Sequence, residues 1–118
     1  MRTLFLSRIL PAILIAVGVA LAGAQVTRAD SVPTFRIELK DGVITPQRLQ
    51  VPANKDFRIE LHNAGTTPAE FESKGLRKEK VVPPDSTSVI LIRKLAPGEY
   101  DLFDDFHPQG AASVLVAE

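Results

Sequence analysis

Apolar and polar residues alternate along much of the chain after residue 33. Between residues 34 and 40, Phe35, Ile37 and Leu39 occupy every second position, with charged side chains between them. The stretch 57–62 repeats this pattern. A period of two is typical of a β-strand that buries one face, so we expect a strand at both places.

Five further stretches have the length and composition of strands, at 43–51, 69–73, 89–92, 100–103 and 114–117. Pro46 removes a backbone donor and predicts an edge or a bulge in the first of them. The continuous apolar run 89–92 predicts a central strand buried on both faces. Because helical spacing is absent and turn residues separate the strands, the pattern predicts an all-β sandwich of about seven strands.

The first 29 residues have the pattern of an export signal. Arg2 and Arg8 precede an uncharged apolar run that ends in small residues. Cleavage after Ala24 or Ala29 leaves a single domain, residues 30–118, which we expect in the periplasm. The run is also close to the roughly 20 residues that span a bilayer, so an uncleaved anchor stays open as the only membrane contact.

Charge and cysteine content narrow the classes of function. The chain has 14 basic and 14 acidic residues, but three of the basic ones lie in residues 1–29, so the exported domain is acidic. Such a domain lacks the basic stripe that nucleic acid requires. The sequence contains no cysteine, and its one methionine is Met1. Disulfides, iron–sulfur clusters, cysteine nucleophiles and soft-ligand copper sites are therefore excluded.

Several motifs in their order along residues 34–118 resemble the cupredoxins. They are Val51-Pro52-Ala53, Asn63-Ala64-Gly65, Pro97-Gly98-Glu99-Tyr100, and a loop with His107 before the last strand. Other motifs resemble the cupredoxin-like subgroup associated with bacterial iron uptake: Glu70-Phe71-Glu72-Ser73, Leu76-Arg77-Lys78-Glu79-Lys80 and Phe103-Asp104-Asp105-Phe106-His107-Pro108. The resemblance implies a Greek-key β-sandwich.

The copper ligands of electron-carrying cupredoxins are mostly missing. Those proteins use a histidine, then a cysteine, a second histidine and usually a methionine. Here the resemblance puts these positions on Ala69 or Glu70, Asp104, His107 and near Ala112. Since a blue-copper centre requires the thiolate, we do not expect a blue-copper electron carrier.

Carboxylates replace the soft ligands and suggest a hard metal site. The candidate metal ligands are Glu70, Glu72, Glu79, Asp104, Asp105 and His107. Such ligands suit iron, manganese, zinc or copper(II), and anionic oxygens favour ferric iron. We expect an iron or copper ion. The resemblance implies an accessory of a high-affinity iron uptake system, with an iron permease and a second periplasmic metal-binding protein as partners. Oxidation of ferrous iron is the one enzymatic activity left open.

A metal-free interaction module is the alternative, with residues 76–80 as a basic docking loop. Clustered carboxylates would favour the metal, because their repulsion needs a cation, and dispersed ones would favour docking. A hydrolase is disfavoured, since no serine has a nucleophile context. We expect His62 to be a surface residue outside any site.

Overall fold

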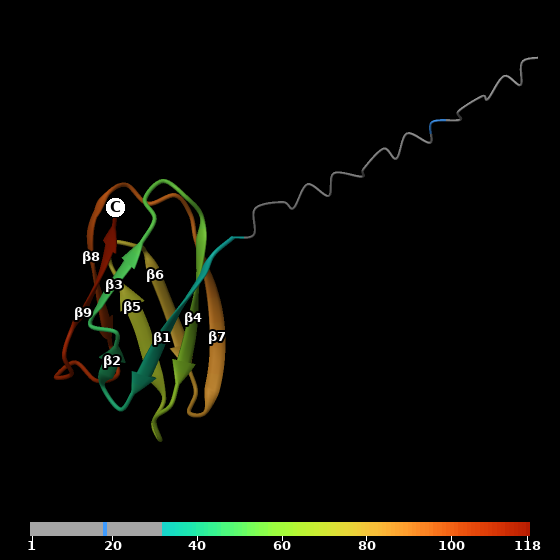
Figure 1. Ribbon diagram of the computed structural model, residues 1–118. Helices are drawn as coiled ribbons and strands as arrows, with labels where there is room; N and C mark the ends of the chain where they lie inside the picture. The colour runs from blue at the N-terminus through green and yellow to red at the C-terminus, as the bar shows by residue number, and fades with distance from the viewer. Residues whose placement is uncertain (1–17, 19–31) are drawn as a thin grey trace, which may run out of the picture.

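The computed structural model describes residue 18 and residues 32–118, and within them it has nine strands and no helix (Figure 1). The strands are β1 (Thr34–Lys40), β2 (Val43–Thr45), β3 (Arg48–Val51), β4 (Phe57–Asn63), β5 (Ala69–Ser73), β6 (Lys78–Val82), β7 (Ser86–Ile92), β8 (Gly98–Asp104) and β9 (Ser113–Ala117). The predicted all-β class is confirmed.

The strands form two sheets that face each other as layers (Figure 1). One has the order β2-β1-β4-β7 and the other the order β3-β9-β8-β5-β6. β1 pairs with β4 and β3 with β9 in parallel, while the other neighbours are antiparallel. This is the sandwich that the alternation predicts.

The two additional strands have local causes. The stretch expected as one strand, residues 43–51, divides at Pro46, because β2 joins one sheet and β3 the other. Both halves are edge strands, as a proline without a backbone donor favours. β6 is the second addition, and its burial pattern shows why it was missed: only Val82 is buried.

The core lies between the sheets and is built from the inward positions of each strand. Ile37 and Leu39 of β1 and Ile59 and Leu61 of β4 are completely buried. From the other sheet, the largest buried side chains are Phe71, Leu102 and Leu115. Burial of one such side chain contributes about 1.5–3 kcal/mol. The alternation found in the sequence therefore marks the core residues of β1 and β4 correctly.

Residues 89–92 form a strand, as predicted, but the prediction of a central strand was wrong. They belong to β7, which is the edge of the four-stranded sheet. Ile90 and Ile92 point toward the core, whereas Val89 and Leu91 are 55% and 38% exposed. An edge strand with apolar residues on its outer face has the same sequence pattern as a central one, so the pattern alone could not separate the two.

The expected export signal, residues 1–29, lies outside the described residues apart from residue 18. Within the described part of the chain, no helix is long and apolar enough to span a membrane.

Candidate functional site

Asp104 ends strand β8 and is the most buried of the candidate ligands, with 4% of its surface exposed. Its Oδ1 accepts hydrogen bonds from the backbone N–H of Glu70, at 3.0 Å, and of Phe106, at 3.1 Å. Its Oδ2 lies 2.7 Å from Nδ1 of His107. The Asp104 carboxylate therefore joins the β8–β9 loop to the start of β5.

A line of hydrogen bonds continues from Asp104 to the opposite side of this end. Nε2 of His107 lies 3.0 Å from Oγ1 of Thr67, and the Thr67 hydroxyl donates to Oδ1 of Asp41 at 2.9 Å. We call Asp104, His107, Thr67 and Asp41 the polar chain. It connects the β8–β9 loop, the β4–β5 loop and the β1–β2 turn.

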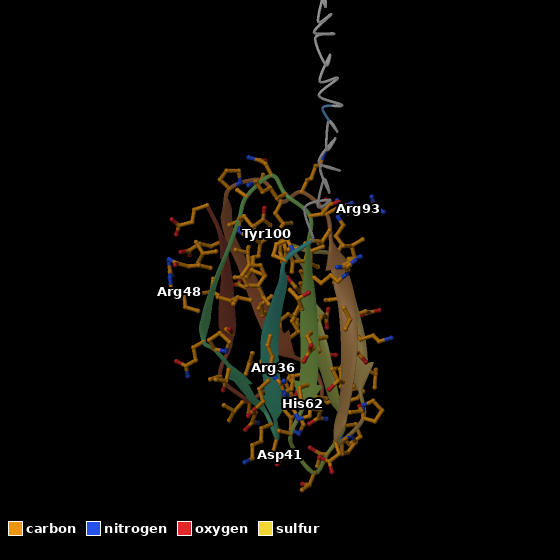
Figure 2. All side chains as sticks on the ribbon, turned by 45° about the vertical axis from the view of Figure 1, so that its right-hand side comes forward. Arg36, Asp41, Arg48, His62, Arg93 and Tyr100 are labelled. Carbon is orange, nitrogen blue, oxygen red and sulfur yellow. The ribbon has the colours of Figure 1, made fainter. Side chains whose placement is uncertain are left out.

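Asp41 is held as an anion at the far end of the polar chain. Figure 2 places it at the opposite end of the sandwich from Arg93. Its Oδ1 also accepts from the backbone N–H of Thr66 and Thr67. The Thr67 hydroxyl, the Thr66 N–H and, more weakly, His107 hold the pKa of Asp41 below its usual value.

Two residues fix the loops that carry the polar chain. The side-chain amide of buried Asn63 donates to the carbonyls of Thr67 and Val82, at 2.9 Å each. A Cβ on Gly110 would lie 2.1 Å from the carbonyl oxygen of Gly42, so only glycine lets these two loops approach so closely. Hydrogen bonds and close packing within the chain thus hold these loops together.

The polar chain does not fit the copper site of the electron-carrying cupredoxins. Asp104 occupies the expected cysteine position, and both of its oxygens already accept hydrogen bonds. Asp104 accepts a hydrogen bond from Nδ1–H of His107, and Nε2 faces the oxygen of the Thr67 hydroxyl, whose proton goes to Asp41. Both ring nitrogens are therefore engaged in hydrogen bonds, and neither is free to bind a metal ion in this arrangement.

The other four candidate ligands lie on the outer face of the five-stranded sheet. Glu70 and Glu72 alternate with buried Phe71 on β5, as expected, and Glu72 pairs in register with Glu79 of β6. The Asp105 N–H donates to the Glu70 carbonyl at 2.9 Å. We call Glu70, Glu72, Glu79 and Asp105 the acidic surface.

The carboxylates of the acidic surface repel one another. Partial burial raises the pKa of Glu70, and the charges of Asp105, Glu79 and Glu72 raise it further. Within the described residues, none of the four forms an ion pair with lysine or arginine. In the same part of the chain, no three His, Cys, Asp or Glu side chains already stand in position to hold a metal ion.

Two expectations about neighbouring residues have different outcomes. Lys78, Glu79 and Lys80 form strand β6 rather than a docking loop, because they pair with residues 71–73 of β5. His62 lies on the outer face of β4, where its ring contacts the hydroxyl of Thr87 at 3.0 Å. It is therefore a surface residue, as predicted.

Sequence reasoning missed Asp41, Thr67 and Asn63. Asp41 precedes Gly42, a pair that indicates only a turn. The available signal was local: Asp, Asn and Thr side chains beside turns commonly bond to nearby backbone groups. Thr67 contacts His107, 40 positions further along the chain, and Asp41 joins them through Thr67. No local pattern encodes this meeting of three loops.

Comparisons with known proteins agree with this architecture. The family model described as a cupredoxin-like domain matches residues 13–117. An uncharacterized protein of Rickettsia prowazekii, RP394, is 36% identical over 87 residues, which are 74% of this chain and 70% of that protein.

Solved structures show the same fold at low identity. A copper binding protein in its apo form superimposes with a TM-score of 0.64 at 15% identity, covering 77% of this chain and 93% of its own. Auracyanin A of Chloroflexus aurantiacus, a blue copper protein, gives a TM-score of 0.61 at 15% identity, with 73% and 99% covered. By its sequence and its fold, the chain belongs to the cupredoxin-like domain family.

Proposed function

We propose that this protein is exported to the periplasm and binds an iron or copper ion through carboxylates, as an accessory of iron uptake and not as a blue-copper electron carrier. The observation that carries the proposal is the acidic surface. Its four carboxylates gather on one sheet face, and no lysine or arginine among the described residues pairs with them. Such a cluster is favourable when a cation occupies it.

The side chains of the acidic surface have oxygen ligands and enough conformational freedom to surround a cation. Glu72 and Glu79 are direct cross-strand neighbours, so their Cβ atoms are about 5 Å apart. Glu79 and Asp105 are exposed, and Glu70 and Glu72 are half-buried. Rotation of these side chains can bring several oxygens to one ion while the strands stay in place.

Asp104 and His107 support this site from beneath. Asp104 accepts a hydrogen bond from the Glu70 N–H, and the Glu70 carbonyl accepts one from the Asp105 N–H. The buried carboxylate therefore keeps Glu70 and Asp105 adjacent. Asp104 and His107 themselves would become ligands only by giving up the hydrogen bonds that connect the loops.

The ligand type favours iron chemistry. Several anionic oxygens stabilise ferric over ferrous iron, so the site favours the ferric ion, and participation in ferrous iron oxidation would require an electron acceptor from outside this chain. An iron permease and a second periplasmic metal-binding protein are the partners that the iron-uptake resemblance supplies. Copper(II) accepts the same oxygen ligands and is the alternative ion.

A metal-free interaction module is the second candidate function. It is favoured by the fact that no three-ligand group is preformed among the described residues. It is also favoured by the polar chain, which closes this end of the domain with internal hydrogen bonds.

Anaerobic isothermal titration of the chelator-treated protein with Fe(II), Mn(II) and Cu(II) separates the two functions. We expect saturable binding that is lost in the Glu70→Gln/Asp105→Asn double variant. Glu60→Gln is the matched control, because Glu60 lies on the other sheet and pairs with Arg36 at 3.3 Å. Absence of binding for all three ions, or unchanged binding in the double variant, would reject the carboxylate site.

A further inference from the structure

A groove of about 660 Å³ runs beside β8 on the outer side of the five-stranded sheet. The β5–β6 turn, at Lys74 and Gly75, and the β8–β9 loop also line it. Part of its wall is apolar, with Phe103, Pro108 and Ala112 among the lining residues. The groove is therefore a depression with apolar contacts on an otherwise polar sheet face.

The charges along this groove are predominantly negative. Leu102 and Asp104 of β8 are buried, so the alternate residues Glu99, Asp101 and Phe103 face outward, and Asp105 follows them. Lys74 is the lysine that lines the groove.

Two of these carboxylates are free to meet a cation. Glu99 already pairs with Arg48 at 3.4 Å, whereas Asp101 and Asp105 form no ion pair within residues 32–118. Two unpaired carboxylates therefore flank Phe103 in the sequence, Asp101 on β8 and Asp105 directly after it.

We infer that this groove binds an extended, cationic segment of a partner protein. Asp101 lies two positions before Phe103 on β8, about 7 Å along the strand, and Asp105 lies two positions after Phe103, just beyond the end of β8. A segment with two basic side chains around a central apolar one matches that spacing. The carboxylates attract the basic groups, and Phe103 contacts the apolar side chain.

The inference does not depend on metal binding. Asp105 is shared with the acidic surface, but Asp101 lies outside it, so Asp101→Asn changes the groove and leaves Glu70, Glu72 and Glu79 untouched. Peptide binding is measured with metal-free protein, and metal binding is measured separately. Failure of one function therefore does not imply failure of the other.

The test is titration of ¹⁵N-labelled full domain with the capped peptide Lys-Ala-Leu-Ala-Lys, followed by amide chemical shifts. We expect shifts concentrated at residues 99–105 and 108–112 and a dissociation constant that rises with salt. Asp101→Asn should weaken the peptide about threefold, as expected for one exposed ion pair. Glu38→Gln, on the other sheet, is the control and should bind like the wild type.

Four outcomes would overturn the inference. They are the absence of shifts, equal shifts with Glu-Ala-Leu-Ala-Glu, shifts centred on the four-stranded sheet, and unchanged affinity in Asp101→Asn. Sedimentation of the peptide-free protein tests whether a second copy of this chain occupies the groove. Self-association that Asp101→Asn abolishes would assign the groove to a copy of this chain instead.

Discussion

At the scale of single residues, the decisive side chain is Asp104, a carboxylate buried within a sandwich that has no cysteine. Three donors face its two oxygens, from Glu70, Phe106 and His107. Such a carboxylate is tolerated in the interior because each oxygen is satisfied. At the position where the resemblance to electron-carrying cupredoxins places the cysteine, this side chain holds the surrounding loops.

Removing Asp104 should therefore destabilise the fold. Asp104→Ala leaves two backbone N–H groups and the His107 ring without their acceptor, and we expect a loss of about 3 kcal/mol in the free energy of unfolding. Urea denaturation measures it. The exposed Asp101→Asn should stay within about 0.5 kcal/mol of wild type. Equal stability of Asp104→Ala and wild type would show that the buried hydrogen bonds make no net contribution to the free energy of unfolding.

The acid dependence of stability should include a contribution from Asp41. Its pKa is lowered in the folded state by the Thr67 hydroxyl and the Thr66 N–H. A lowered carboxyl pKa gives stability that is present above the unfolded value, near 3.8, and is lost as the pH falls through the folded value.

Asp41→Asn removes that titration. We expect the variant to be less stable than wild type at pH 6 and the difference to shrink as the pH falls below 4. Thermal unfolding across this range measures it. A difference that stays constant with pH would mean that Asp41 acts through geometry and not through its charge.

At the scale of strands, alternation identified β1 and β4 because their apolar residues fall on the inward face. It failed at two edge strands: in β6 only Val82 is buried, and in β7 apolar residues also occupy the exposed positions. The acidic surface was predictable in composition, since Glu70 and Glu72 share one face of β5. Its contact with Glu79 and Asp105 depends on strand pairing, and the polar chain depends on loops that meet only in the folded molecule.

The pairing of these strands makes a prediction about Glu70, whose pKa is raised by partial burial and by its acidic neighbours. In metal-free protein at pH 7, Glu70→Gln should raise the midpoint of thermal unfolding, because it removes repulsion between β5, β6 and the β8–β9 loop. The gain should disappear at low pH, where protonation of Glu70 removes the same repulsion.

The same comparison of thermal stability with added metal should favour the wild type over Glu70→Gln. When Mn(II) is added, the wild type should gain more thermal stability than Glu70→Gln, because ligands that bind the folded state stabilise it. A variant that is less stable than wild type without metal would contradict the proposed repulsion.

At the scale of the whole molecule, the cupredoxin-like fold carries carboxylate chemistry at one end and on one face. The polar chain closes one end of the sandwich, and the acidic surface lies on the outer face of the five-stranded sheet. The sequence, without cysteine, already excluded a thiolate site. What the sequence could not provide was the separation of the six candidate ligands into a hydrogen-bonded pair, Asp104 and His107, and a group of four on the sheet surface.

This separation predicts the response to copper. Added Cu(II) should give only the weak visible absorption of oxygen and nitrogen ligands, since the intense blue band requires a thiolate. Visible absorption and electron paramagnetic resonance measure it, with a blue-copper protein as the reference. An intense band in the visible region would contradict the assignment of the site to carboxylates.

The most direct test of the central claim is the position of a bound ion. Substoichiometric Mn(II) broadens amide NMR signals of residues near it, so a ¹⁵N spectrum of the chelator-treated protein locates the site. We predict selective broadening at residues 70–72, 79 and 104–106, and its loss in the Glu70→Gln/Asp105→Asn variant. Broadening centred on another part of the fold, or none at Mn(II) concentrations that saturate carboxylate sites, would contradict a metal site on the acidic surface.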